Sequence, residues 1–85
     1  MRGFKPCPGF DRYFVNTDGD VLYINQRGAL KSVHKGFRRG CVIVKIRKTG
    51  ESETREIHVI SLIRKTFGEK EATLWKVSQE NPWRR

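Results

Sequence analysis

Residues that could bind a metal ion or cross-link the chain are scarce in this sequence. It has two histidines and two cysteines, and the cysteines, Cys7 and Cys41, stand far apart. Zinc sites usually pair cysteines about two to four positions apart, so this spacing predicts no metal cluster. A single disulfide between them is one alternative, and free thiols in a reducing cytosol are the one we favour.

Long apolar runs are also missing. No stretch approaches the roughly 20 apolar residues that a membrane-spanning helix needs. The first nine residues contain no apolar run that could act as a signal peptide. We therefore expect a cytoplasmic protein that does not contact a membrane.

Acidic residues are absent from the middle of the chain. The sequence has 18 Lys and Arg against nine Asp and Glu, a formal charge of +9. Eight cations and no acid lie between residues 27 and 48: Arg27, Lys31, Lys35, Arg38, Arg39, Lys45, Arg47 and Lys48. Phosphates attract such a stretch whatever the base sequence, because neutralising them releases counterions. We expect these residues to bind nucleic acid, duplex DNA above all; the alternative is a solvated basic face without a partner.

The chain has enough apolar residues for one small core. Hydrophobic residues make up 36% of its 85 positions and nine residues are aromatic, which places it outside the disordered class. We expect a single domain over residues 1–85. In it, residues 8–67 form a sheet and a helix, and residues 68–85 pack on them or extend from them.

Turn signals rich in Gly, Asp and Asn divide the first part of the chain into short β-branched or aromatic runs. These signals include Asp18-Gly19-Asp20, Lys35-Gly36 and Arg39-Gly40. The runs predict strands near Tyr13–Asn16, Val21–Ile24, Ala29–Val33, Cys41–Arg47 and Ser52–Ile57, of which the last two form the surest hairpin. In Cys41–Arg47, alternation predicts a core face of Val42, Val44 and Ile46 and an opposite face of Ile43, Lys45 and Arg47.

After Glu56 the spacing of apolar residues becomes helical. Val59, Leu62, Ile63, Thr66 and Phe67 form the stripe of one amphipathic helix, which Gly68 can end. The tail is ambiguous, because Trp75, Val77 and Trp83 could pack on the sheet while Pro82 excludes a helix running through it. The predicted fold class is α+β: a small twisted antiparallel sheet of meander or hairpin type, packed by one amphipathic helix.

Residues suited to hydrolysis are few. His34 lies in a turn, and His58 is expected to be a half-buried residue at the junction of strand and helix. Asp18-Gly19-Asp20 favours a tight turn, and the Val-Leu-Tyr that follows lacks the oxygen ligands of a calcium loop. We therefore predict that the protein is not an enzyme and has no catalytic residue, metal site or cofactor.

Phe37 stands between Gly36 and the Arg38-Arg39 pair, in a predicted turn. It is either an anchor in the core or a ring that stacks on an unpaired base. We favour the core position.

Several motifs follow one another in a characteristic order. The stretch from Pro8 to Val21 reads Pro-Gly-Phe-Asp-Arg-Tyr-Phe-Val-Asn-Thr-Asp-Gly-Asp-Val. Leu30-Lys31, a glycine-led strand at Gly40–Ile46 and the helix segment Leu62–Phe67 come next. This order resembles the NUMOD4 module at the N-terminus of phage and intron-encoded HNH homing endonucleases, which opens with Gly-aromatic-acid and Tyr-x-Val-Ser-Asn-x-Gly-x-Val.

The chain departs from that family in two places. The family histidine usually precedes the helix leucine by two positions, where this chain has Ile60, while His58 stands four before it. The metal-binding ββα segment is missing, because only Gly68–Thr73 separates the helix from Leu74–Asn81, which resembles the family's closing motif. In the family the sheet region helps position the enzyme on duplex DNA. The resemblance thus implies a non-catalytic phage protein that contacts DNA through its basic hairpins, and that acts in the host cytoplasm if it is phage-encoded.

Two other functions remain open. A small phage protein of this kind could bind and inhibit a host nucleic-acid-processing protein by occupying its acidic or nucleic-acid-binding surface. An active nuclease would require His58 to join Asp18 or Asp20 around a metal ion.

Overall fold

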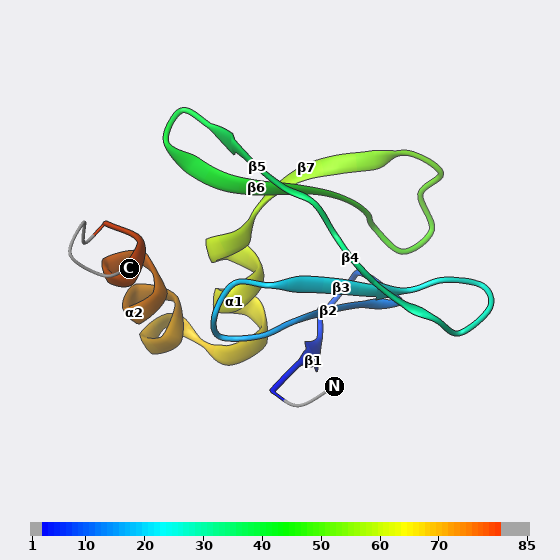
Figure 1. Cartoon of the computed structure of the whole chain (residues 1–85), viewed down its shortest axis with the longest axis horizontal. Helices are drawn as coiled ribbons and strands as arrows, with labels where there is room; N and C mark the ends of the chain where they lie inside the picture. Colours follow the sequence, from blue (N-terminus) through cyan, green and yellow to red (C-terminus); the bar gives the residue numbers. More distant parts are fainter. Residues whose placement is uncertain (1–2, 81–85) are drawn as a thin grey trace.

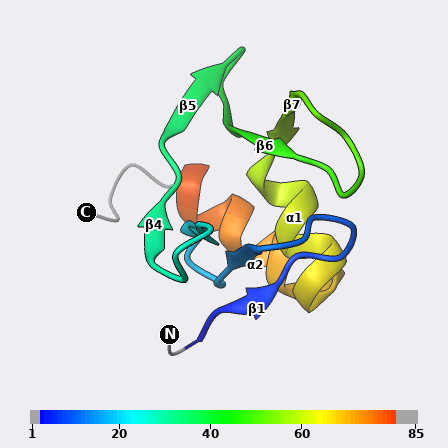
Figure 2. The ribbon, with the colours of Figure 1, turned by 90° about the vertical axis from the view of Figure 1, so that its right-hand side faces the viewer.

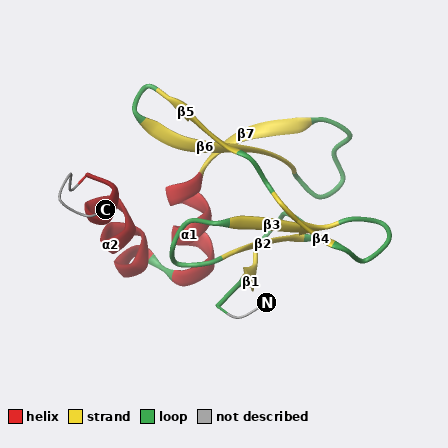
Figure 3. Cartoon of the chain, in the orientation of Figure 1, coloured by secondary structure: helices red, strands yellow, loops and turns green. Residues whose placement is uncertain are grey.

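The computed structural model describes residues 3–80 and has an α+β fold of two antiparallel sheets and two helices (Figures 1 and 3). Sheet A contains, in spatial order, β1 (Lys5–Pro6), β2 (Tyr13–Val15), β3 (Val21–Ile24) and β4 (Leu30–Ser32). Sheet B contains β5 (Lys35–Arg38), β6 (Cys41–Arg47) and β7 (Thr54–His58). The helices are α1 (Val59–Phe67) and α2 (Glu69–Glu80). The predicted fold class is confirmed.

The predicted strands are all present, but they divide into two sheets. The division falls at residues 33 and 34, between β4 and β5. The Lys35-Gly36 pair was predicted as a turn and instead begins strand β5, where Gly36 lies opposite Ile43 of β6. The chain can form this hairpin because the two residues Arg39-Gly40 are enough to reverse it between β5 and β6.

Strand β6 follows the predicted alternation closely. Val44 and Ile46 are 1% and 0% exposed on the core face, whereas Lys45 and Arg47 are exposed on the other face. Ile43 shares that outer face and is nevertheless 7% exposed; its side chain lies beside Gly36, the residue opposite it in β5.

Helix α1 closes one side of the core. Its predicted stripe is present: Val59, Leu62 and Ile63 are each at most 1% exposed. The helix packs against β2, β6 and β7, and so it joins the two sheets (Figures 1 and 2). It ends where expected, since Gly68 adopts φ 108° and its N–H donates to the carbonyl of Arg64.

The tail forms a second helix that the sequence analysis did not predict. Helix α2 begins directly after Gly68, with Glu69 and Glu71 in its first turn, where carboxylates favour the helix dipole. Trp75 packs back on the fold, as the sequence analysis allowed for the tail. Val77 does not, because it is 56% exposed. Residues 82 and 83, on which the tail prediction also relied, lie outside the described residues.

The core lies between the sheets and helices and contains one of the two cysteines. Cys7 is 4% exposed in the core cluster, whereas Cys41 is exposed, and the two are free thiols. Neither described helix has the length and apolar character needed to cross a membrane.

Candidate nucleic-acid interface

The β5–β6 hairpin carries the Arg38-Arg39 pair at its tip. Arg38 pairs with Cys41, so Arg39 and Gly40 form a two-residue loop. Their φ angles are 53° and 78°, both left-handed, as in a type I′ turn that matches the twist of the strands. The tip stands clear of both helices (Figures 1 and 2), and Arg38, Arg39 and Gly40 are all exposed. Two guanidinium groups are thus presented at a projecting turn.

Phe37 lies beside this tip and is 77% exposed. The preferred prediction, that it anchors in the core, is therefore wrong. Phe37 pairs with Val42 and so lies on the core-side face of sheet B, but Val42 is itself only partly buried. The core ends before it reaches this level of the hairpin, and the phenyl ring remains open to solvent.

The outer face of sheet B is the surface turned away from the core. Side chains alternate along each strand, so register places on it Arg38, Cys41, Ile43, Lys45, Arg47, Thr54, Glu56 and His58. Its charged groups, His58 aside, are three cations and one acid. That acid, Glu56, lies directly opposite Lys45 and forms an ion pair with Arg38, whose Nε lies 3.4 Å from the Glu56 Oε1. The outer face therefore carries a net positive charge, with Arg38 near the tip and Lys45 and Arg47 in the second half of β6.

The eight predicted site residues do not form one surface. Arg38, Arg39, Lys45 and Arg47 come together on the β5–β6 hairpin, and the exposed Lys48 follows at the end of β6. Arg27 and Lys31 belong to sheet A instead, and their turn lies at the opposite end of the view in Figure 1.

Lys35 also leaves the basic face. It pairs with Val44, on the core side of sheet B, and its Nζ lies 3.1 Å from Oδ1 of Asp20 in the β2–β3 turn. The ion pair between Lys35 and Asp20 therefore links sheet B to sheet A.

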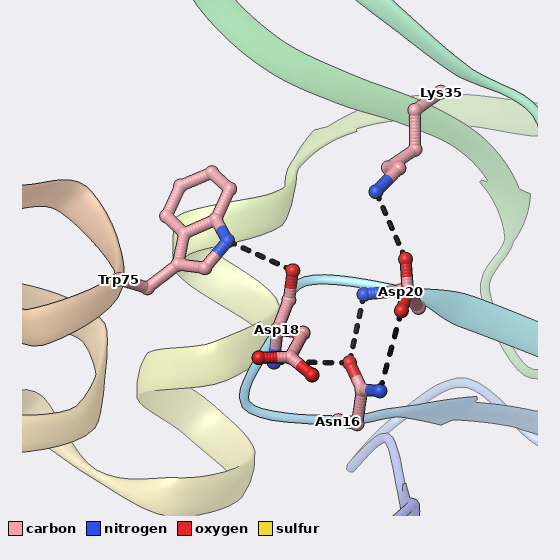
Figure 4. Close-up of polar contacts among 5 residues, drawn as sticks. All are labelled: Asn16, Asp18, Asp20, Lys35 and Trp75. Atoms are coloured by element: carbon pink, nitrogen blue, oxygen red, sulfur yellow. Dashed lines mark hydrogen bonds and ion pairs between the residues drawn. The ribbon is translucent and has the colours of Figure 1, made fainter. Parts of the chain in front are cut away.

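The predicted tight turn at Asp18-Gly19-Asp20 is confirmed, and Asn16 builds it (Figure 4). The Asn16 Oδ1 accepts hydrogen bonds from the N–H groups of Asp18 at 3.1 Å and Asp20 at 2.8 Å. Gly19 adopts φ 83°, and the indole N–H of Trp75 donates to the carbonyl of Asp18 at 3.2 Å. The two carboxylates thus belong to a structural turn that helix α2 covers.

A second turn of the same build joins β3 to β4. The Asn25 Oδ1 accepts from the N–H groups of Arg27 at 2.9 Å and Ala29 at 3.0 Å, and Gly28 adopts φ 82°. The sequence analysis missed this correspondence. The shared Asn-x-x-Gly spacing at Asn16 and Asn25 is the signal that would have found it.

The two histidines occupy separate elements. His34 is exposed in the link between the sheets, and His58 is the last residue of β7, next to α1. His58 stands at the predicted junction but is exposed, so the expectation that it is half-buried is wrong. Within residues 3–80, no three His, Cys, Asp or Glu side chains are grouped as metal ligands would be.

A cleft of about 450 Å³ opens between sheet A and the β6–β7 loop. Tyr13 and Tyr23 line it, with ring centroids 5.9 Å apart and planes tilted by 34°. The Tyr13 hydroxyl accepts a hydrogen bond from the Arg47 N–H at 3.3 Å, which fixes the end of β6 to sheet A. Sequence reasoning did not find this cleft, because its walls come from three separate segments, residues 11–13, 23–26 and 47–51.

Burial changes the pKa of one cysteine thiol, that of Cys7. Desolvation raises the pKa of the Cys7 thiol to about 11, so this group stays protonated at neutral pH. Cys7 is therefore a packing residue, whereas Cys41 lies exposed beside the hairpin tip.

Comparison of the chain with family models, with curated proteins and with solved structures finds no match.

Proposed function

We propose that this protein binds duplex DNA through the β5–β6 hairpin and does not cut it. The observation that carries the proposal is the position of Arg38 and Arg39, which are exposed at a hairpin tip that stands clear of the body. A two-stranded ribbon fits the major groove, which is about 12 Å wide. In this arrangement the tip enters or straddles a groove.

The charge of the hairpin supports contact with the phosphate backbone. Lys45 and Arg47 continue the basic surface from the tip along β6, with Glu56 as the one acid on the outer face. Binding of this kind positions the protein on DNA without reading its sequence. We therefore expect low sequence preference and strong dependence on salt.

Phe37 adds an apolar group next to the cations. Its phenyl ring is 77% exposed on the face of the hairpin opposite Arg38. In the major groove an exposed phenyl ring can make apolar contact with a thymine methyl group. Arg38 and Arg39 would hold the backbone while Phe37 contacts the bases.

The proposal also rests on the resemblance to the NUMOD4 module. The family has its nuclease segment between the helix and the closing motif. This chain has only Gly68–Thr73 at that place. We therefore expect neither nicking nor cleavage of duplex DNA in the presence of Mg²⁺, Mn²⁺ or Zn²⁺. Metal-dependent nicking that a His58→Ala change abolished would refute this part.

A salt titration tests the electrostatic part. If about five phosphates are neutralised, the logarithm of the binding constant falls against the logarithm of salt concentration with a slope of roughly −4 to −5. Fluorescence anisotropy with a generic labelled duplex measures it. A slope near zero would contradict contact with phosphates.

A pair of charge reversals tests the location. Replacing both Arg38 and Arg39 by Glu should weaken duplex binding more than about tenfold, because each change replaces attraction to phosphate by repulsion. The matched control reverses Arg27 and Lys31, which carry the same charge on sheet A, and should weaken binding less than about threefold. Equal losses would mean that diffuse charge, and no defined site, attracts the DNA.

A protein partner is the second candidate. The observation that favours it is the pair of apolar side chains one turn apart on α2, Leu74 at 55% and Val77 at 56% exposed. A host nucleic-acid-processing protein bound there would remain captured after nuclease treatment and at moderate salt. Duplex DNA bound at the hairpin would be lost under both conditions.

A further inference from the structure

The cleft between sheet A and the β6–β7 loop combines an aromatic wall with a basic rim. Tyr13 and Tyr23 supply the wall, and Arg12, Arg47 and Lys48 line the cleft around it. Its volume of about 450 Å³ lies within the usual range for small-molecule sites. We infer that this cleft binds one nucleotide, with the base against the tyrosine rings and the phosphate on the basic rim.

The aromatic wall suits a base. Both tyrosines are partly buried, and their pairing across β2 and β3 holds the two rings side by side on the face of sheet A toward sheet B. Rings held in this way present a surface on which any base can stack, because every base has a π face. The Tyr13 hydroxyl is bonded to the Arg47 N–H, which leaves the Tyr23 ring as the more adaptable one.

The charges around the cleft favour an anion. Two carboxylates also line it, but Glu51 is held by Arg55 in a bidentate ion pair with both distances 2.7 Å. Among the remaining lining charges, Arg12 and Lys48 outnumber Asp11, and Arg47 adds a third cation from the outer face of β6. An anionic phosphate is therefore favoured over a neutral or cationic group.

The backbone of Arg12 is consistent with a built site. Arg12 adopts φ 71°, a left-handed conformation that non-glycine residues seldom take. Its guanidinium donates to the Asn25 carbonyl at 3.4 Å, so the side chain reaches from the start of β2 to the end of β3, beside the cleft. Strained residues of this type occur preferentially where a ligand is bound.

The cleft and the hairpin tip can act independently. They lie at opposite ends of β6, whose seven residues span roughly 20 Å. The inference therefore does not rest on duplex binding at the tip. A free mononucleotide and an unpaired nucleotide within a strand share the chemistry that the cleft recognises.

Titration of adenosine 5′-monophosphate into ¹⁵N-labelled protein at low salt tests the inference. We expect saturable shifts of backbone amides that line the cleft, such as those of Gly50 and Tyr23. Lys48→Glu, a change in an exposed loop that the fold tolerates, should weaken this binding about tenfold. Tyr23→Ala should also weaken it about tenfold, whereas Tyr23→Phe, which keeps the ring, should bind like the parent.

Three further arms separate the alternatives. The Arg38→Glu and Arg39→Glu double variant should bind the mononucleotide like the parent, even where it fails to bind duplex. The second arm uses a duplex with a short single-stranded overhang. If this duplex shifts the cleft amides and the mononucleotide does not, the ligand is an unpaired nucleotide within a strand. Inorganic phosphate that binds as tightly as the mononucleotide would overturn the inference, as would the absence of cleft shifts with either nucleotide source.

Discussion

The β2–β3 turn and the β3–β4 turn are built from the same bonds and differ in what lies over them. In each, an asparagine Oδ1 accepts two backbone N–H groups and a glycine takes a left-handed conformation. The Trp75 ring covers Gly19, whereas a Cβ at Gly28 would meet nothing within 4 Å. Local sequence therefore makes a turn of this type, and distant residues decide how much depends on it.

The last position of each turn shows the same contrast. Asp20 carries a carboxylate that pairs with Lys35 of sheet B, whereas the equivalent Ala29 has no group to offer. The first turn thus joins sheet A to sheet B and to helix α2. The second is a surface loop, and no ring among the described residues covers its glycine.

The largest expected difference between the turns comes from adding one methyl group to each glycine. In Gly19→Ala the new Cβ would collide with the Trp75 Nε1 and lie 2.9 Å from Cε2, in a backbone already at φ 83°. We expect a loss of about 3 kcal/mol, of which left-handed strain contributes about 1 kcal/mol and overpacking the rest. Gly28→Ala has the strain alone and should lose about 1 kcal/mol. Urea unfolding measures both, and equal losses would contradict a rigid cover over Gly19.

Removing the cover is the second test. Trp75→Phe deletes the indole N–H that bonds the Asp18 carbonyl and leaves a small cavity beside Gly19. We expect a loss of about 2 kcal/mol in the free energy of unfolding. Val77→Ala, an exposed position on the same helix, should change it by less than about 0.5 kcal/mol. A Trp75→Phe loss as small as the control would mean that α2 does not hold the turn.

The contrast between covered and open positions extends to the two thiols. The Cys7 pKa is raised from 9.0 to about 11 by burial, so the folded state keeps the thiol proton at pH values where the unfolded state loses it. Its contribution to stability is therefore complete below pH 9 and is lost as the pH rises toward 11, by about 2 kcal/mol.

Paired variants isolate this contribution from other groups that titrate at high pH. The stability difference between the parent and Cys7→Ala should shrink from pH 8.5 to pH 11, whereas the difference for Val77→Ala, which exchanges two side chains that do not titrate, should stay constant. A difference that did not change with pH for Cys7→Ala would show that its thiol is accessible to water.

The smallest expected effect concerns the two asparagines. Asn16→Ala and Asn25→Ala each remove two side-chain hydrogen bonds to the backbone and should each cost about 1 kcal/mol. Combined with Trp75→Phe, Asn16→Ala should cost less than it does alone, because the turn no longer has to fit the indole. Asn25→Ala should be additive with Trp75→Phe, and coupling there would break the distinction between the turns.

The parts of the fold that depend on neighbouring residues were predictable. The apolar spacing from Val59 predicted α1, alternation predicted the faces of β6, and Asp18-Gly19 predicted a turn. Helix α2 was not predictable in the same way, because few of its residues are buried and its apolar spacing is weak. Ala72 and Trp75 are its buried apolar residues in the described part of the chain.

The arrangement of the predicted basic site depended on distant contacts. Lys35 is directed to Asp20, 15 positions earlier, and no local pattern indicates that pairing. The division of the strands into two sheets separates Arg27 and Lys31 from the hairpin. Phe37 is a large apolar residue of the kind usually found in a core. Its exposure depends on where the core ends, which cannot be predicted from the neighbouring sequence.

Arg39 occupies the first position of a type I′ turn, where Asn, Asp or Gly is the common residue. An asparagine or glycine there would relieve a left-handed arginine and raise stability by roughly 1 kcal/mol. It would also remove one of the two guanidinium groups at the tip. Selection for heat resistance alone would therefore replace Arg39, whereas selection for the proposed duplex binding would retain it, so the two pressures can be set against each other at a single codon.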